Sequence, residues 1–465
     1  MVNDHFFDFS SEEMLSRRFA GKLLLRKEIP LSDHHFKQLL LRDQFKSMPA
    51  IVKHKFSYTC QRCHNRKLSL FANIPCYRCQ MTHLYCRKCI HMGRIMSCEP
   101  LYYWTGKEPS WTCFDDPCTW QGTLTKDQQK AADQLIKAIK DQKRELLIWA
   151  VTGAGKTEML FPGISEALKN GKRICLATPR VDVVYELLPR LQQAFSHVYI
   201  QGLYAGSDDQ DASAQFLVAT THQLLRFKNA FDVLIIDEMD AFPYHADPSL
   251  PFAAKRARKN VSTTIYLTAT PRKAQRIRVK KNELACQFVP RRFHGFPLPV
   301  PQFKMSFHLQ KYLRTYKLPP TFFQWFKQRQ KRQLLIFVPT RSLADHLAKN
   351  LQPFFQKHKT FATSVHADDL DREEKITSFR KHKFTILVTT TILERGVTFP
   401  SVDVVVIDAG HDVFDTAALV QIAGRAGRSP NDPTGEVIFI HDGKTKAMKW
   451  AVHFISMMNK RGGFK

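Results

Sequence analysis

The stretch Glu145-Leu-Leu-Ile-Trp-Ala-Val-Thr-Gly-Ala-Gly-Lys-Thr157 decides the fold, because an apolar run leads directly into a glycine-rich turn. A run that is apolar on both faces is typical of a strand buried in a parallel sheet. The turn follows the phosphate-binding pattern G-x-x-x-x-G-K-[ST], except that Ala150 stands at its first position. The sequence therefore predicts a strand, a phosphate-binding loop and a helix in succession.

The residues of this loop are candidate ligands of ATP. Glycine lets backbone N–H groups wrap the phosphates, and the N-terminus of the following helix adds its positive end. We expect Lys156 to reach the β- and γ-phosphates and Thr157 to ligate Mg²⁺. The candidate nucleotide-binding residues of the loop are Gly153, Ala154, Gly155, Lys156 and Thr157.

A second part of the candidate site is the acidic end of Leu234-Ile-Ile-Asp-Glu-Met-Asp240. A carboxylate that ends a buried strand can hold the Mg²⁺ that bridges the β- and γ-phosphates. We assign Asp237 to Mg²⁺ and Glu238 to polarising the attacking water. The alternative is a solvated acidic loop, which the preceding apolar run disfavours.

Two arginines in Gln421-Ile-Ala-Gly-Arg-Ala-Gly-Arg428 are candidate partners of the same nucleotide. At a helix start, the i, i+3 spacing of Arg425 and Arg428 would present both guanidinium groups on one side. In a protein with two lobes, we expect them to reach the γ-phosphate of the nucleotide held by Lys156, as arginine fingers do. A basic surface patch is the alternative.

Short apolar runs alternate with helical segments on both sides of the phosphate-binding loop. After the loop, such runs begin at Arg173, Gln215, Asp232, Thr264, Gln333, Thr385, Val402 and Gly435. Proline breaks the pattern at Pro297–Pro301 and again at Pro319-Pro320, which indicates a connection between domains. We predict an α/β protein with two tandem RecA-like lobes, each built on a parallel sheet.

The charge balance favours a polyanionic partner. Lys and Arg number 70 against 42 Asp and Glu, which gives a formal net charge of +28 in 465 residues. Nucleic acid is the commonest partner of such a surface, and a basic surface that only confers solubility is the alternative. No apolar stretch is long enough to span a bilayer, and the N-terminus lacks a secretory pattern. We therefore expect a cytoplasmic, reducing environment.

Nine of the 11 cysteines lie between Cys60 and Cys118, in a segment poor in aliphatic residues. Three C-x₂-C pairs occur there, namely Cys60/Cys63, Cys76/Cys79 and Cys86/Cys89. Two such pairs supply the four thiolates of a tetrahedral Zn²⁺ site. Free buried cysteines do not explain the repeated spacing, and a redox C-x-x-C normally lies in a thioredoxin-like context that is absent here. The spacing alone leaves open which pairs share the metal.

These observations divide the chain into four parts. We predict a basic N-terminal region over residues 1–55, with one amphipathic helix around Glu12–Leu25, and a zinc-binding module over residues 56–122. The two lobes would follow over residues 123–295 and 296–465. Basic residues between the cysteines, together with aromatic residues such as Tyr77 and Tyr102–Trp104, could grip single-stranded DNA. A solvated basic face is the alternative.

The ordered motifs resemble those of the superfamily 2 helicases over about residues 124–430. In this resemblance, Gln128 corresponds to an adenine-reading glutamine, and Gly396 joins the candidate nucleotide-binding residues. The other matching segments are Thr178-Pro-Arg180, Tyr204-Ala-Gly-Ser207, Thr220-Thr-His-Gln-Leu-Leu225, Thr268-Ala-Thr270, Phe337-Val-Pro-Thr-Arg341, Ser364-Val-His366 and Thr389-Thr-Thr-Ile-Leu-Glu-Arg-Gly-Val-Thr398. The segment at 268–270 corresponds to one that couples hydrolysis to lobe movement.

The chain more closely resembles the ComFA family of late-competence DNA-uptake ATPases. The likeness lies in Cys60-Gln-Arg-Cys63, Leu84-Tyr-Cys-Arg-Lys-Cys-Ile-His-Met-Gly-Arg94, Gly155-Lys-Thr-Glu-Met-Leu-Phe-Pro-Gly163 and Asp240-Ala-Phe-Pro-Tyr244. It implies one zinc ion held by Cys60, Cys63, Cys86 and Cys89. Cys76 and Cys79 depart from the family pattern: they could bind a second metal with Cys98, Cys113 or Cys118, replace a pair, or stay free.

The resemblance implies an ATP-dependent translocase that drives transforming DNA into the cytosol. Its partners would be single-stranded DNA, the competence uptake channel and other late-competence proteins, with peripheral contact at the inner face of the cell membrane. One alternative is a replication-restart or repair helicase like PriA, whose motifs are also similar. The other is a nucleotide-switched DNA-binding scaffold without motor activity. The sequence carries no signature of translocation polarity or oligomeric state.

Overall fold

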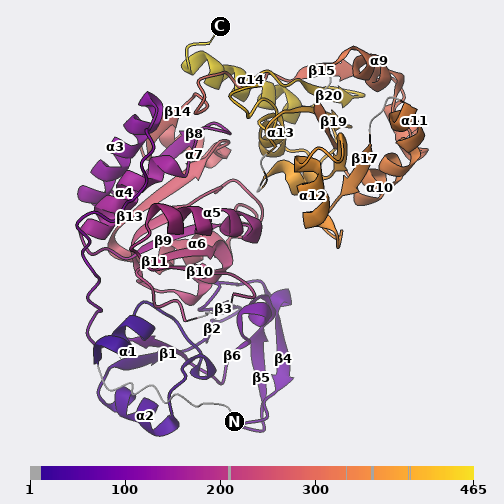
Figure 1. Ribbon diagram of the computed structural model, residues 1–465. Coiled ribbons are helices and arrows are strands. Elements are labelled where there is room, and N and C mark those ends of the chain that lie inside the picture. The colour runs from indigo at the N-terminus through magenta and orange to yellow at the C-terminus, as the bar shows by residue number, and fades with distance from the viewer. Residues whose placement is uncertain are drawn as a thin grey trace, which may run out of the picture.

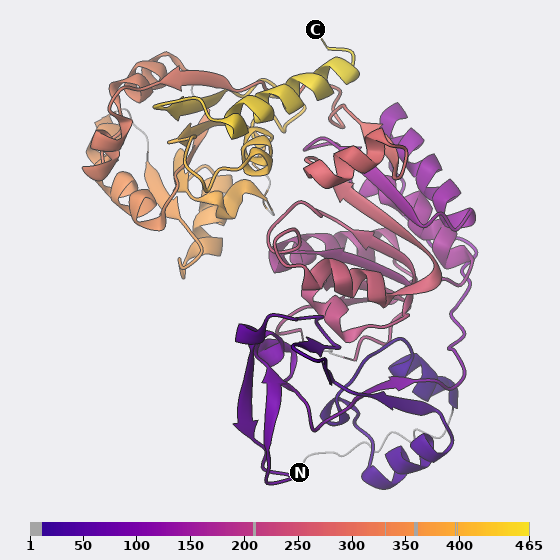
Figure 2. The same ribbon diagram turned by 180° about the vertical axis from the view of Figure 1, so that it is seen from behind.

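The computed structural model describes residues 12–207, 211–330, 332–357, 361–395, 397 and 399–464. Figure 1 shows three parts: an N-terminal region in indigo below, a first lobe in magenta and pink, and a second lobe in orange and yellow. Figure 2 shows the same arrangement from behind. Both lobes are α/β units with parallel sheets, so the predicted fold class is confirmed.

The N-terminal region is built from short helices and short antiparallel strands. Its elements are α1 (Glu12–Phe19), η1 (Arg26–Glu28), α2 (Asp33–Leu41), β1 (Phe45–Met48), β2 (Ile51–Lys53), β3 (Tyr58–Cys60), η2 (Leu68–Leu70), β4 (Phe71–Pro75), β5 (Thr82–Cys86), η3 (Arg87–Met92), β6 (Ile95–Met96) and β7 (Leu101–Trp104). Helix α1 is shorter than the predicted Glu12–Leu25, because Lys22 and Leu24 already form bridges to Phe227 and Tyr102.

Contacts in this region cross the predicted division at residues 55 and 56. Strand β1 pairs antiparallel with β7, so Phe45 lies opposite Trp104. One small core contains Leu15, Phe19, Phe45 and Trp104 from both sides of the division. These contacts favour treating residues 12–104 as one unit, and the four-part division stays a prediction.

Lobe 1 has a seven-stranded parallel sheet in the order β10-β11-β9-β12-β13-β8-β14. Its elements are α3 (Lys126–Lys140), β8 (Glu145–Ala150), η4 (Glu158–Leu160), α4 (Phe161–Lys169), β9 (Ile174–Thr178), α5 (Val181–Ala194), β10 (Ile200–Leu203), β11 (Phe216–Thr220), η5 (Thr221–Arg226), β12 (Phe231–Ile236), α6 (Ser249–Ala257), β13 (Arg258–Thr268), α7 (Lys273–Lys280) and β14 (Ala285–Val289). Because the strands are parallel, the residues after β8, β12 and β13 meet at one edge of the sheet.

The two faces of this sheet have different coverings. Apolar residues of α3, α4 and α5 pack on one face. Residues of η5 and α6 pack on the other face, where the same core also contains Cys60, Cys63, Cys86 and Cys89 of the N-terminal region. The N-terminal region is therefore docked on lobe 1.

Lobe 2 has a six-stranded parallel sheet in the order β15-β20-β19-β16-β18-β17. Its elements are β15 (Gln302–Met305), α8 (Leu309–Arg314), α9 (Pro320–Gln328), β16 (Gln333–Phe337), α10 (Arg341–Asn350), α11 (Gln352–Lys357), β17 (Ala362–Val365), α12 (Arg372–Arg380), β18 (Ile386–Thr389), η6 (Thr391–Glu394), β19 (Val402–Ile407), α13 (Thr416–Ala423), β20 (Val437–His441) and α14 (Lys446–Arg461). Within the described part of the chain, no helix is long and apolar enough to cross a membrane.

The connection between the lobes lies before β15. Since β15 already belongs to the second sheet, Pro319-Pro320 lies inside lobe 2 rather than between the lobes, and Pro320 begins α9. The chain just before β15 is held by α14: the side chain of Asn459 accepts from the Leu298 N–H and donates to the Leu298 carbonyl, both at 2.9 Å.

Candidate functional site

The phosphate-binding loop follows β8 and leads into η4 and α4, as predicted. Gly153 and Gly155 have φ of +77° and +68°, a backbone conformation that favours glycine. A Cβ added at Gly155 would lie 2.3 Å from the Gln128 side-chain nitrogen. The loop is therefore packed tightly against the start of α3, where glycine has steric as well as conformational reasons to be present.

Gln128 is buried between its own helix and this loop. Its Nε2 donates to the Ala154 carbonyl at 2.9 Å, and its Oε1 accepts from the Thr125 N–H at 2.8 Å. The second bond belongs to a capping box that begins α3. One end of the amide thus holds the loop and the other end caps α3, and adenine contact by Gln128 stays a prediction.

Asp237 and Glu238 follow β12 beside the phosphate-binding loop. Asp237 is fixed by its own N–H, which donates to the Ala177 carbonyl at 2.9 Å. Burial raises the pKa of Asp237 to about 6, against the opposing effect of Lys156. The two side chains assigned to phosphate and metal therefore interact electrostatically, and a cation beside them would favour the ionised carboxylate.

Asp240 and Arg395 join the two lobes at this site, and the sequence analysis assigned neither a role. Arg395 of lobe 2 is 3% exposed and contacts Asp240 at 2.6 Å and Glu238 at 3.4 Å. The hydroxyls of Thr268 and Thr270 also donate to Asp240.

The ionisation of this pair follows from those contacts. Burial alone would raise the pKa of Asp240, but Arg395 and the two hydroxyls hold it at about 2. Burial alone would lower the pKa of Arg395, but the carboxylates of Asp240, Glu238 and Glu394 raise it. The pair is therefore a buried ion pair at ordinary pH. Only the presence of Arg395 in a matched motif could have drawn attention to it.

Arg425 and Arg428 do not lie at a helix start, so this part of the prediction is wrong. Helix α13 ends at Ala423, and both arginines lie in the turn that follows. The lobes approach closely at this turn, because a Cβ at Gly424 would lie 1.9 Å from the Thr152 hydroxyl. The Arg425 Nε donates to the Glu394 carbonyl at 3.1 Å. Burial and the neighbouring Arg428 lower the pKa of Arg425.

Arg292 is a further interlobe residue that the sequence analysis missed. It follows β14 and is 1% exposed. Its guanidinium donates to the carbonyls of Gly427 and Gly424, the latter at 3.3 Å. Its aliphatic portion lies beside Gly153. Arg292 therefore connects the phosphate-binding loop to the arginine-bearing turn.

One cleft of about 670 Å³ contains the predicted nucleotide-site residues of both lobes. Those among its lining residues are Gln128, Gly153, Ala154, Gly155, Lys156, Thr157, Asp237, Glu238, Arg425 and Arg428. Gly396 lies outside the described residues. Within the described chain, the Thr152 hydroxyl, the Gln421 Nε2 and the Arg425 Nη2 are buried without a hydrogen-bond partner. Unpaired donors beside Lys156 fit a polyanionic ligand such as ATP with Mg²⁺.

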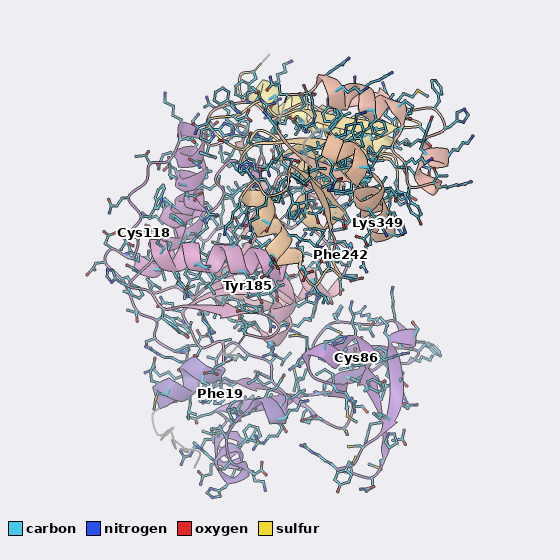
Figure 3. All side chains as sticks on the ribbon, turned by 45° about the vertical axis from the view of Figure 1, so that its right-hand side comes forward. Phe19, Cys86, Cys118, Tyr185, Phe242 and Lys349 are labelled. Carbon is cyan, nitrogen blue, oxygen red and sulfur yellow. The ribbon has the colours of Figure 1, made fainter. Side chains whose placement is uncertain are left out.

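A second cleft of about 730 Å³ also lies between the lobes. Segments that match the helicase motifs contribute Arg180, Arg341 and Thr390 to its lining. Phe242 lines it too and is 72% exposed, and Figure 3 shows this residue where the two lobes face each other. In contrast, η5, which contains most of the predicted segment 220–225, is buried beneath the N-terminal region rather than in this cleft.

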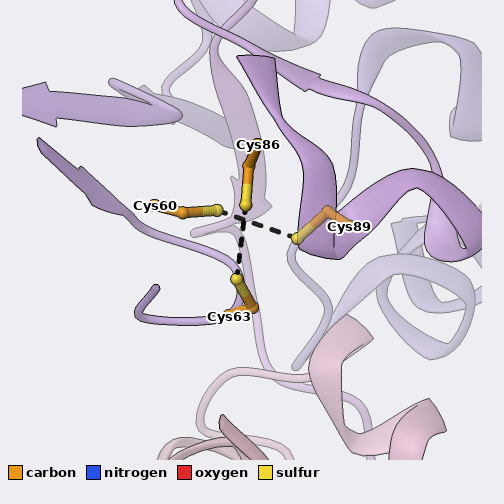
Figure 4. A group of neighbouring side chains, drawn as sticks. All are labelled: Cys60, Cys63, Cys86 and Cys89. Atoms are coloured by element: carbon orange, nitrogen blue, oxygen red, sulfur yellow. Dashed lines mark hydrogen bonds between the residues drawn. The ribbon is translucent and has the colours of Figure 1, made fainter. Parts of the chain in front are cut away.

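Cys60, Cys63, Cys86 and Cys89 form a compact, buried cluster. Figure 4 shows their side chains pointing toward one another. All four sulfurs lie within 4.8 Å of one another, with 3.8 Å between Cys60 and Cys89 and 3.7 Å between Cys63 and Cys86. A tetrahedral Zn²⁺ site with Zn–S bonds of about 2.3 Å has S···S edges of roughly 3.8 Å. The donor set and spacing therefore fit Zn²⁺.

Four of the residues proposed to grip DNA in this module have other partners. Arg62 is fully buried and pairs with Glu28 at 2.5 Å, and Lys88 pairs with Asp247. Tyr102 and Trp104 pack in or against the small N-terminal core. Arg66, Lys67, Tyr77, Arg78, Arg87 and Arg94 remain exposed. The aromatic strand 102–104 is thus structural, and the exposed basic residues form a smaller set than expected.

Comparison with known proteins identifies the family. The family described as "Competence protein ComFA N-terminal domain" matches residues 8–103. Competence protein ComFA of Bacillus subtilis is 44% identical over 97% of this chain and 96% of its own length. The chain belongs to the ComFA family. ComFA of Streptococcus pneumoniae is 40% identical over 96% of this chain and 98% of its own length.

Each of the two lobes also matches a broader family. "Type III restriction enzyme, res subunit" matches residues 121–273, and "Helicase conserved C-terminal domain" matches residues 314–430. The structures of yeast Dbp5 bound to RNA and ADP BeF3, and of Mss116p bound to ssRNA and AMP-PNP, have TM-scores of 0.52 and 0.51. They share 19% and 16% identity, each over 73% of this chain and over 88% and 76% of their own, and so show the fold. This ComFA-family chain is thus a competence-related, ATP-hydrolysing enzyme of the helicase type.

Proposed function

We propose that this chain is an ATP-driven translocase on single-stranded DNA that draws transforming DNA into the cytosol. The observation that carries the proposal is the cleft that gathers a phosphate-binding loop and carboxylates from lobe 1 with arginines from lobe 2. Family membership supplies the competence context. The uptake channel, other late-competence proteins and the inner face of the membrane are its proposed partners and location.

Each residue of the nucleotide cleft has a proposed task. Lys156 and the loop N–H groups would hold the phosphates, and Thr157 and Asp237 would hold Mg²⁺, which when bound would supply positive charge beside the phosphate oxygens. Glu238 accepts a hydrogen bond from the attacking water and orients it. Arg425 has an unpaired buried Nη2 in this cleft and donates to the transferring phosphoryl group, together with Arg428.

The Asp240–Arg395 pair connects this chemistry to the arrangement of the lobes. Arg395 contacts Glu238 as well as Asp240, and Asp240 accepts from Thr268 and Thr270. A change at Glu238 on hydrolysis therefore acts directly on a lobe 2 residue. This contact supports the role in coupling hydrolysis to lobe movement that the resemblance implied for residues 268–270.

The second interlobe cleft is the proposed path of the DNA strand. Arg180 and Arg341 supply positive charge from opposite lobes, and the exposed ring of Phe242 offers a stacking surface for a base. Arg180 also donates to the Ile392 carbonyl of lobe 2 at 3.0 Å. Opening and closing of the lobes would therefore change the cleft that contacts the strand.

We further propose that Cys60, Cys63, Cys86 and Cys89 bind Zn²⁺ with a structural role. The cluster is buried in a core shared with η5 and α6 of lobe 1. The side chain of Asn65 donates toward the Cys86 sulfur at 3.9 Å, as expected for the outer shell of a thiolate site. The metal would thus hold the N-terminal region in the shape that fits lobe 1.

The central test measures ATP hydrolysis and strand movement by the full chain. Single-stranded DNA should stimulate hydrolysis, and the chain should displace a protein block from one end of a strand. Lys156→Ala and Glu238→Gln should abolish turnover while DNA binding persists, and Arg314→Ala on the exposed side of α8 should match the wild type. Slow hydrolysis at saturating DNA without displacement would favour a nucleotide-switched scaffold, and robust unwinding of forked DNA would favour a PriA-like helicase.

Arg425→Ala tests the interlobe part of the site. Removal of an arginine finger typically lowers kcat by about 10³–10⁵-fold. We expect a loss of this order with little change in nucleotide binding, measured by a fluorescent ATP analogue. Arg425→Lys should recover little, because one ammonium cannot replace the planar guanidinium. Unchanged turnover in Arg425→Ala would contradict the role assigned to this residue.

A further inference from the structure

Three cysteines outside the buried cluster converge at the end of a projecting hairpin. Cys76 and Cys79 lie in the turn between β4 and β5, and Cys98 follows β6. Their sulfurs lie within 4.8 Å of one another, with 3.8 Å between Cys76 and Cys98. That distance equals the edge of roughly 3.8 Å expected for two thiolates on one Zn²⁺.

The turn at Cys76 has the same backbone structure as the turn at Cys60 in the buried cluster. The Cys60 N–H donates to the Asn65 carbonyl, and the His64 N–H donates back to the Cys60 carbonyl. At the hairpin end, the Cys76 N–H donates to the Met81 carbonyl, and the Gln80 N–H donates to the Cys76 carbonyl.

The backbone torsions of the two turns agree as well. His64 and Gln80, each four residues after the first cysteine, have φ of +59° and +56°. The chain therefore forms the same C-x₂-C knuckle twice, once in each group of cysteines. A turn that orients two sulfurs toward a shared point in the first group does the same in the second.

The third strand of the hairpin sheet supplies the third sulfur. Strand β6 pairs with β5 so that Met96 lies opposite Tyr85, and the Ser97 N–H donates to the Leu84 carbonyl at 2.8 Å. This pairing brings Cys98 to the knuckle. The other cysteines left open by the spacing lie elsewhere: Cys113 lies beside Gly171 of lobe 1, and Cys118 packs against the core of the lobes.

A histidine beside the Cys79 sulfur is the candidate fourth donor, and its ring would have to move closer to the other two sulfurs to share a metal with them. The Nε2 of His83, in β5, lies 2.9 Å from the Cys79 sulfur. Its other ring nitrogen, Nδ1, lies 3.4 Å from the Ser97 hydroxyl. Ring nitrogens of metal-bound histidines commonly have such a polar partner on the side away from the metal. Three thiolates and one imidazole form one of the usual ligand sets of structural Zn²⁺.

We propose that Cys76, Cys79, Cys98 and His83 bind a second Zn²⁺, in addition to the ion at the buried cluster. This replaces the expectation of one zinc ion per chain, and it does not depend on motor activity. The buried site lies in the core shared with lobe 1, whereas this second site lies at an exposed tip. Figures 1 and 2 show the β4–β5 hairpin running away from lobe 1.

The second ion would order the surface at this tip. Tyr77 is 92% exposed and Met81 is 60% exposed, so little apolar burial holds the turn in place. Metal ligation is the usual means of fixing so small a segment. The bound Zn²⁺ would link the hairpin turn to the chain after β6 and hold Tyr77 and Arg78 in a defined position.

Zinc content of the full chain tests the proposal. The wild type, purified in the presence of Zn²⁺ and then freed of loosely bound ions, should contain two zinc ions per chain. Cys76→Ser/Cys98→Ser should contain one and should keep the wild-type circular dichroism spectrum. Cys113→Ser, which alters another exposed cysteine, is the matched control and should contain two. One ion in the wild type, or two in the double variant, would overturn the proposal.

Cobalt substitution tests the ligand set without relying on stability. With Co²⁺, the wild type should show thiolate-to-metal charge transfer and visible bands of tetrahedral cobalt, and the double variant should lose about half of the charge-transfer intensity. His83→Ala should shift the visible bands while retaining that intensity. An unchanged cobalt spectrum in His83→Ala would overturn the assignment of the imidazole ligand, and full intensity in the double variant would overturn the site.

Discussion

At the scale of single residues, the site depends on charges that face one another across the lobe boundary. Asp240 and Arg395 form a fully buried pair with two threonine hydroxyls as additional donors. Such pairs are expensive to break from one side, because the remaining charge stays buried without a partner. In this protein, the Asp240–Arg395 pair links an arginine of lobe 2 to Asp237 and Glu238 at the end of β12.

Asp240→Asn should therefore destabilise the chain strongly. Loss of one partner of a buried pair typically costs about 3–5 kcal/mol, and we expect a lower denaturant midpoint by the corresponding amount. Asp368→Asn is the matched control, because Asp368 pairs with Arg341 at the exposed surface, where a pair is worth about 0–1 kcal/mol. Equal midpoints for both variants would contradict the importance of the buried pair.

The pH dependence of this effect follows from the pKa of about 2 for Asp240. A carboxyl whose pKa is lowered by folding contributes stability above its unfolded pKa, and loses it as pH falls through the folded value. The difference between wild type and Asp240→Asn should thus be constant from about pH 5 to 8 and shrink only below about pH 4. Unfolding curves at several pH values check this.

The types of residue in the nucleotide cleft could be predicted from sequence, but not all their partners. Lys156, Asp237 and Glu238 follow apolar runs, and parallel strands bring such positions to one edge. Arg292 and Arg395 carry no comparable signal, since an arginine that becomes buried looks like any other in a basic chain. Their roles follow from which lobe surfaces meet, and local patterns do not encode that.

At the scale of secondary-structure elements, the apolar runs predict the central strands of both sheets well. They do not predict the short strands at the sheet edges. Strand β8 begins and ends within the predicted run, but β10, β15 and β17 are short edge or near-edge strands without a long apolar signal. The arginine-bearing turn was predicted as helical because spacing alone was considered. The turn instead follows the end of α13 and packs so closely against the phosphate-binding loop that there is no room for a side chain at Gly424.

One arginine of α6 contributes several hydrogen bonds to the docking of the zinc-binding region. The guanidinium of Arg256 donates to the carbonyls of Leu225 and Phe227 in lobe 1 and to those of Gln61 and Arg62 beside the cysteine cluster. The distances range from 2.6 to 3.0 Å. This side chain therefore satisfies backbone groups on both sides of the interface at once.

Arg256→Ala should loosen that interface. Truncation leaves several backbone carbonyls without a donor, and we expect a loss on the order of 3 kcal/mol, together with faster tryptic cleavage between the N-terminal region and α3. Arg256→Lys should restore little, because one ammonium cannot reach carbonyls on both sides. Lys255→Ala, at an exposed neighbouring position, is the control. Equal cleavage rates in the two alanine variants would contradict the role of Arg256.

At the scale of the whole molecule, the net charge of +28 overstates the charge available to DNA. Arg62, Arg173, Arg292 and Arg425 are each among the largest fully buried side chains and donate to carbonyls or carboxylates within the protein. Composition therefore predicts a polyanionic partner but not the size of its binding site. That size has to come from the basic residues that the fold leaves exposed.

Salt dependence of DNA affinity measures this remaining charge. For single strands, log K falls with log salt with a slope of about −0.7 per neutralised phosphate. If about four phosphates are contacted, affinity should fall roughly 50-fold between about 50 and 200 mM salt. Fluorescence anisotropy with labelled single-stranded DNA gives the slope directly. A slope near zero would contradict electrostatic binding across the second cleft.

The two hydrogen bonds between Asn459 and Leu298 define where the connection between the lobes ends. Because α14 fixes both polar backbone groups of Leu298, the connection is part of lobe 2 from that residue onward. Strand β14 ends at Val289, so the connection between the lobes is formed by the residues between 289 and 298, and within it the Phe293 N–H donates to the Gly153 carbonyl at 2.9 Å. The connection between the lobes is thus short and is held at one end by α14, so we expect lobe 2 to rotate about it if the cleft opens. Arg292 lies in this connection, so a rotation of lobe 2 would separate its guanidinium from the carbonyls of Gly424 and Gly427.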